Sequence, residues 1–91
     1  MNESNFMKAI LKGANLTGAV ARRSNFIQAD FSRAKMVGMD LMEANLMKAR
    51  LVGADLRLAS LYGAEVMKAV LGETDFSMAN LKMTKLARYY K

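Results

Sequence analysis

A period of five residues runs through almost the whole chain. Every fifth residue from Phe6 to Leu86 is apolar, and these residues form a column of mostly large side chains. Two places before each of them lies a second column, from Ser4 to Thr84, which holds Ala at 12 of its 17 positions. Positions five apart scatter around an α-helix, because five steps turn the chain by about 500°. In a straight strand they alternate between the two faces. The period therefore excludes both an amphipathic helix and a flat strand. The large column has 17 members without an insertion: Phe6, Leu11, Leu16, Ala21, Phe26, Phe31, Met36, Leu41, Leu46, Leu51, Leu56, Leu61, Val66, Leu71, Phe76, Leu81 and Leu86.

The chain must bend once in each unit if both columns face the same interior. Five of the six glycines mark the bend, because they follow the large residue by two positions: Gly13, Gly18, Gly38, Gly53 and Gly63. The third residue of a type II turn needs a positive φ, which glycine adopts without steric cost. We therefore predict a turn that starts at each large residue and joins the short sides of a coil.

The units GANLT, QADFS, EANLM and GADLR closely resemble the pentapeptide-repeat proteins, whose consensus is A(D/N)LXX. The resemblance covers residues 4–86 without interruption, which makes it far more specific than a single motif. It implies an all-β fold, a right-handed quadrilateral β-helix with four units to a coil and about four and a half coils. We expect one β-helix domain over residues 1–86 and a short tail or cap over residues 87–91.

One place breaks the alternation of small and large side chains. Ala21 is undersized for the large column, and Met39, which belongs to the next coil, is oversized for the small column. Interiors are close-packed, and Met adapts its shape to irregular gaps. We predict that Met39 fills the space that Ala21 leaves.

The composition argues against catalysis and against cofactor or metal binding. The chain contains no His, Cys or Trp, which removes most general-base, thiol and zinc arrangements. Most carboxylates directly precede a large apolar residue, where hydrogen bonds to the nearby backbone are the expected role. We predict that the chain is not an enzyme and has no catalytic, cofactor-binding or metal-binding residues.

The same composition bears on the location of the protein. Without cysteine, a disulfide framework is impossible, and nothing argues for export. The N-terminal MNESNFMKAILKGANL lacks the features of a signal peptide and already belongs to the repeat. No run approaches the roughly 18 apolar residues of a membrane span. We expect a cytoplasmic protein that does not contact the membrane.

The first side of the coil carries the candidate partner-binding residues. Exposed apolar area rimmed by charge is typical of protein interfaces. The alternative is an ordinary strand surface that lysine stems cover. We predict a noncatalytic interaction module that docks a protein partner here. With a period of 20 residues, this side has an apolar stripe of Met7, Ile27, Met47 and Met67. Beside the stripe lies a basic column of Lys8, Lys48, Lys68 and Arg88, in which Gln28 takes the place between Lys8 and Lys48.

Three other functions stay open. The net charge of +6 suits nonspecific nucleic-acid binding through phosphate attraction, although no aromatic platform or groove-reading helix accompanies it. The family resemblance also implies relatives that imitate DNA and bind type II topoisomerases, which the positive charge disfavours. Residues 61–86 resemble repeat segments of proteins that accompany bacterial type VI secretion systems, which would indicate a role in assembly.

The ends of a β-helix expose unpaired backbone groups and an open core. Tyr89 and Tyr90 are large and amphipathic, so they are suited either to a local lid or to an end-to-end interface. A tail of five residues is too short to cover a whole coil. We therefore predict an end interface at the two tyrosines, through which a homodimer or a partner would associate.

Overall fold

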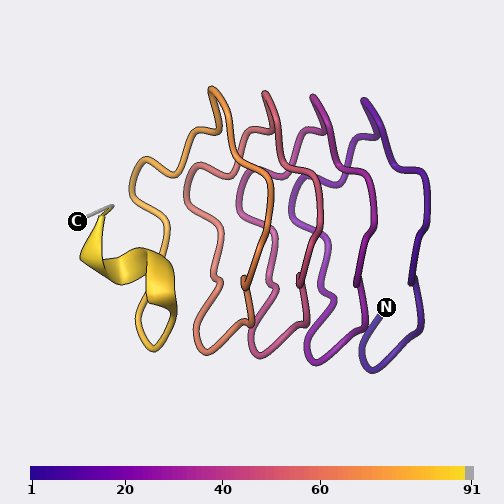
Figure 1. Ribbon diagram of the computed structural model, residues 1–91, viewed down its shortest axis with the longest axis horizontal. Helices are drawn as coiled ribbons and strands as arrows, with labels where there is room; N and C mark the ends of the chain where they lie inside the picture. The colour runs from indigo at the N-terminus through magenta and orange to yellow at the C-terminus, as the bar shows by residue number, and fades with distance from the viewer. Residues whose placement is uncertain (90–91) are drawn as a thin grey trace.

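The computed structural model describes residues 1–89, which wind into a coil whose turns stack along one axis (Figure 1). Isolated parallel bridges pair residues 20 positions apart, from Asn5 with Asn25 to Ser60 with Asn80. Each coil therefore takes 20 residues, and a turn after every fifth residue gives it four sides. This is the spacing that the sequence predicts.

Each side is too short to form a conventional strand. A single residue per side, the one before the large apolar residue, makes the bridge. Its neighbours complete the ladder: the Phe6 N–H donates to the Asn25 carbonyl at 2.7 Å, and the Asn25 N–H donates to the Ser4 carbonyl at 2.8 Å. Within residues 1–89 the helix content is one 3-10 helix, η1 (Lys85–Arg88).

The turns start at the large apolar residues, as predicted. In the first of them the Ala9 N–H donates to the Phe6 carbonyl at 3.0 Å, and the same bond recurs along the coil. The third residue of each turn has a positive φ, which defines a type II turn. Glycine occupies five of these positions, but 12 others hold residues with side chains, all at φ between 52° and 62°.

Two substitutions of opposite expected sign test the turn conformation. Leu58 is 60% exposed and has a φ of 62°, a left-handed conformation that is unfavourable for a residue with a side chain. Leu58→Gly therefore removes this backbone strain and loses little packing. We expect a gain of roughly 0.5 kcal/mol in the free energy of unfolding, because glycine's extra chain entropy offsets part of the relief. Gly18 has φ 71° and open space around a built Cβ, so Gly18→Ala should cost about 1 kcal/mol through the backbone alone.

Urea denaturation of both variants measures these changes. A loss of stability in Leu58→Gly, or none in Gly18→Ala, would show that the positive φ of these turns costs no stability when the residue has a side chain.

The core lies inside the coil and contains both columns. Phe26 and Phe31 are fully buried, and their ring centroids are 5.1 Å apart. Phe6 stacks on Phe26 at the same distance, with ring planes 7° apart. Ala21 and Met39, the pair with exchanged sizes, are both fully buried in the same cluster. That Met39 fills the space that Ala21 leaves stays a prediction.

The coil ends where the chain turns into η1. On the first side the last bridge joins Asn45 with Glu65, and the next unit forms the helix instead of a fifth rung. Leu86, the last apolar residue of the large column, is still buried. Tyr89 is 76% exposed, so its side chain does not pack into the core as a lid would. Tyr90, the other residue of the predicted end interface, lies outside the described residues.

Candidate protein-docking face

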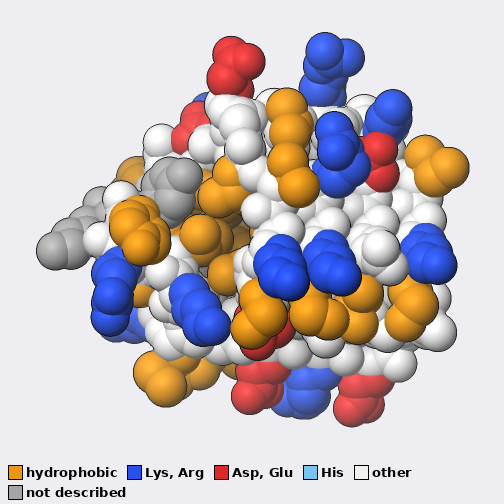
Figure 2. Space-filling model, viewed as in Figure 1, with side chains coloured by type: hydrophobic (Ala, Val, Ile, Leu, Met, Phe, Trp, Pro, Cys, Tyr) orange, Lys and Arg blue, Asp and Glu red, His pale blue; other side chains and the backbone are white. Residues whose placement is uncertain are grey.

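The apolar stripe lies on the first side of the coil, as the period of 20 predicts. The ladder bonds bring its members into register: the Lys8 N–H donates to the Ile27 carbonyl at 2.9 Å, and the Lys48 N–H donates to the Met67 carbonyl at the same distance. Met7 and Met67 are 47% and 41% exposed, whereas Ile27 and Met47 are half-buried between them. Figure 2 shows a row of hydrophobic side chains along the axis, with a row of basic side chains beside it.

The backbone of each stripe residue is held by the side chain two positions earlier. The backbone N–H of each stripe residue donates to a side-chain oxygen at 2.9–3.0 Å. For Met7, Ile27, Met47 and Met67 the acceptors are the side chains of Asn5, Asn25, Asn45 and Glu65, respectively. These N–H groups point outward and take no part in the ladder. The column of Asn5, Asn25 and Asn45 thus fixes the backbone of the stripe.

The basic column presents unpaired charge. Lys8, Lys48 and Lys68 are exposed turn residues with φ of 59–61°. None of the three forms an ion pair with another residue of the described chain. Gln28 lies between Lys8 and Lys48 in the same column. Arg88 does not continue it, because the chain has already turned into η1 at that residue.

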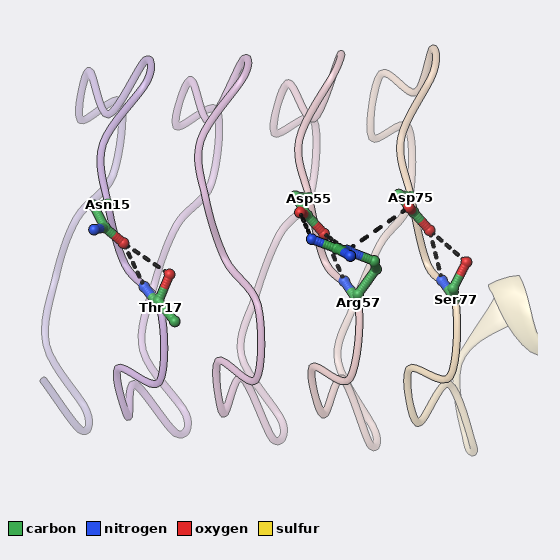
Figure 3. Close-up of polar contacts among 6 residues, drawn as sticks. All are labelled: Asn15, Thr17, Asp55, Arg57, Asp75 and Ser77. Atoms are coloured by element: carbon green, nitrogen blue, oxygen red, sulfur yellow. Dashed lines mark hydrogen bonds and ion pairs between the residues drawn. The ribbon is translucent and has the colours of Figure 1, made fainter.

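The acidic residues have structural roles on the third side, which Figure 3 shows. Asp55 accepts two hydrogen bonds from the Arg57 guanidinium, at 2.8 and 2.7 Å. Asp75 accepts from the Ser77 hydroxyl at 2.6 Å and from the Ser77 N–H at 2.9 Å. The Arg57 side chain lowers the pKa of Asp55. The Ser77 hydroxyl, and then its amide, lower the pKa of Asp75. Backbone hydrogen bonding, predicted for the carboxylates that precede large residues, is confirmed here.

This arrangement predicts an acid-dependent contribution to stability from Asp75. Its pKa in the folded chain lies below the ordinary value of 3.8, so its contribution is present above that pH and is lost as the pH falls through the folded pKa. In Asp75→Asn the amide can still accept from Ser77, as Asn15 accepts from Thr17 at 3.2 and 2.8 Å. We expect this variant to lose less stability than the wild type between pH 7 and pH 3.

Urea denaturation midpoints at the two pH values measure that difference. Equal acid losses in the two proteins would mean that Asp75 titrates alike in the folded and unfolded chain.

Some exposed residues escaped the sequence analysis. Ile10 is 81% exposed, and Val20 and Val70 are also exposed, at the position of the repeat that most often holds Asn or Asp. These apolar residues at a position that is usually polar were the sequence signal by which they could have been identified. Arg33 and Arg50 are further exposed cations, which the sequence analysis did not single out.

The described residues were searched for side-chain groups that could hold a metal ion and for helices that could cross a membrane. No group of three or more acidic residues within residues 1–89 is arranged to hold a metal ion. In the same part of the chain, no helix has the length and apolar character to cross a membrane.

A search of protein families matches the chain with the pentapeptide repeats, in eight copies, over residues 9–46, 24–63 and 40–77. The chain therefore belongs to the pentapeptide-repeat family. Its members are in general structural or interaction modules rather than enzymes. A search of curated protein sequences found no match.

Solved structures of the family share the fold. The pentapeptide repeat protein Rfr23 from the cyanobacterium Cyanothece 51142 is 32% identical with a TM-score of 0.86, over 91% of this chain and 58% of that one. A pentapeptide repeat protein from the thylakoid lumen of Arabidopsis thaliana is 25% identical with a TM-score of 0.55, over 91% of this chain and 61% of that one. The chain thus spans about three fifths of the length of these two structures.

Proposed function

We propose that the chain is a noncatalytic interaction module that docks a protein partner through the stripe of Met7, Ile27, Met47 and Met67. The basic column of Lys8, Lys48 and Lys68 forms one rim of the contact. We infer that the coil that carries this face is right-handed and has about four and a half turns, as the family fold implies.

The observation that carries the proposal is the combination of apolar exposure with a fixed backbone. Each stripe residue has its outward N–H bound by the side chain two positions earlier. A surface ordered in advance loses less conformational entropy on binding, which favours affinity. Methionine side chains adapt to the shape of a partner, so a rigid backbone with Met side chains suits an interface.

The rim defines the chemistry of the partner. The three lysines form no ion pairs within the described chain, so their charge is free for acidic groups. Complementary charge at a rim mainly raises the association rate and selects the partner. The partner should therefore present apolar side chains bordered by Asp or Glu.

Affinity capture from the native host, with purified chain as bait, tests the proposal. Met47→Ser with Met67→Ser should lose most of the captured partner, because two neighbouring residues of the stripe become polar. The matched control is Met78→Ser with Met83→Ser, which changes two exposed methionines outside the stripe and should leave capture unchanged.

Nucleic-acid binding is the competing result. Retention of DNA that falls steeply with added salt, and that the two stripe substitutions do not change, would contradict docking through the stripe. The net charge of +6 gives no support to imitation of DNA.

Two further roles stay predictions. A place in a bacterial secretion-system assembly rests on residues 61–86 alone, and a homodimer rests on the exposed Tyr89. Sedimentation of the full chain at high micromolar concentration tests the dimer, which a monomeric mass would exclude.

A further inference from the structure

A shallow groove crosses the second side of the coil, away from the apolar stripe. Its volume is about 430 Å³, and its lining comes from three successive coils: Lys12, Gly13, Ser32, Arg33, Arg50 and Val52. Three of these six residues carry a positive charge. The ladder bonds hold the three coils in register, since the Arg33 N–H donates to the Val52 carbonyl at 2.8 Å and the Gly13 N–H to the Ser32 carbonyl at 2.9 Å.

The two arginines of the groove have unused donors. Within residues 1–89 neither Arg33 nor Arg50 forms an ion pair or a side-chain hydrogen bond. A guanidinium carries five N–H donors in a planar fork that matches the oxygens of a phosphate. Lys12, the third cation, lies 3.9 Å from a carboxylate oxygen of Asp30.

The glycine on the following coil, Gly53, makes room for the side chain of Arg33. A Cβ at Gly53 would lie 3.3 Å from the Arg33 Cγ, so the stem of Arg33 lies against the bare backbone of the next coil. A Cβ at Gly13 would have nothing within 4 Å, which shows that the groove is open on that side. Both glycines have positive φ, so the turn conformation also favours them.

The charges of the groove leave an excess of two. Lys12, Arg33 and Arg50 contribute three positive charges, and Asp30 beside them contributes one negative charge. The ordinary pKa of the Asp30 carboxyl group is 3.8, and hydrogen bonds from the Ser32 hydroxyl and amide lower this pKa further, so Asp30 is ionised at neutral pH. A phosphate monoester carries a charge of about −1.5 to −2 at pH 7, which is close to the opposite of this excess.

We propose that this groove binds a phosphate group, with Arg33 and Arg50 as the donors to the phosphate oxygens and Lys12 as the third cation. The ligand is small, since the groove has a volume of only about 430 Å³. Either free phosphate or a small phosphorylated molecule can supply the group. This site is independent of the proposed protein-docking face on the first side.

Nuclear magnetic resonance of the ¹⁵N-labelled full chain tests the site at constant ionic strength. The two probes are inorganic phosphate and adenosine monophosphate. We expect saturable shifts of the Arg33 and Arg50 Nε–H signals and of the backbone amides of residues 12, 13, 32, 33 and 50–53. Tighter binding of the ester would identify a small phosphorylated molecule as the ligand, and equal binding would identify phosphate itself.

Matched charge substitutions distinguish the site from general ionic attraction. Arg33→Gln and Arg50→Gln should each weaken binding at least about tenfold, since each removes a charged hydrogen-bond donor. Lys48→Gln removes the same charge from the first side and should leave the affinity unchanged. Shifts that spread over both sides of the coil, do not saturate, or persist in Arg33→Gln would overturn the proposal.

Discussion

Phe26→Ala should lower the free energy of unfolding by roughly 3–5 kcal/mol, which is a large part of the stability of a small domain. Phe26 is fully buried, and its ring lies 5.1 Å from the rings of both Phe6 and Phe31. Removal of the ring leaves a cavity that the neighbouring coils cannot close, because backbone hydrogen bonds between the coils fix their spacing. Equilibrium urea denaturation followed by far-ultraviolet circular dichroism measures the loss.

Phe6→Ala is the matched control for this variant. Phe6 belongs to the same aromatic stack but lies in the first coil, where it is only partly buried. Less apolar surface is then returned to water, and the cavity is open to solvent, so we expect a loss of roughly 1–2 kcal/mol. Equal losses in the two variants would contradict a core whose packing is tightest in the inner coils.

Much of this fold could be predicted from the sequence, because the repeat encodes both local and long-range structure. Phe26 and Ala29 are separated by one turn, and the same spacing of large and small residues recurs at every corner. A uniform period of 20 then fixes which side chains stack, since an insertion would shift every later side. Gly18 predicts a positive φ by its identity, but Lys8 adopts the same conformation without any such signal. Its turn is stabilised by the ladder to the next coil, where the Lys8 N–H donates to the Ile27 carbonyl.

The end of the coil could not be predicted as well as its interior. The spacing of large residues continues to Leu86, yet η1 begins at Lys85 and takes Arg88 out of the basic column. The five-residue period alone does not distinguish another rung from a helix, because a ladder also needs a coil on which to stack. The last unit has a neighbour on one side only.

The candidate faces depend on features that the sequence contains only in part. The period placed Met47 and Met67 in one stripe, but it could not show that Met47 is half-buried while Met67 is exposed. The groove on the second side was not predicted at all. It depends on Arg33 lying against Gly53, and that contact follows from the direction of a long side chain rather than from spacing.

The exchanged pair Ala21 and Met39 gives the second large prediction. Met39→Ala should cost roughly 2–5 kcal/mol, because Met39 is fully buried beside a position already occupied by a small residue. Ala21→Leu alone should cost roughly 1–3 kcal/mol, since the new side chain needs the space that we expect Met39 to fill. The Ala21 N–H donates to the carbonyl of Asp40, the residue after Met39, at 2.8 Å, which places the two positions on adjoining coils.

The double variant Ala21→Leu with Met39→Ala should recover a stability within about 1 kcal/mol of the wild type, far from the sum of the single losses. It restores on the fourth side the pattern of the later coils, where Leu41, Leu61 and Leu81 occupy the large column. As a control, Met39→Ala combined with Val66→Ala, on another side of a later coil, should give additive losses. Additive losses for Ala21 and Met39 as well would show that the two residues fill separate spaces, because only a shared space makes one substitution compensate the other.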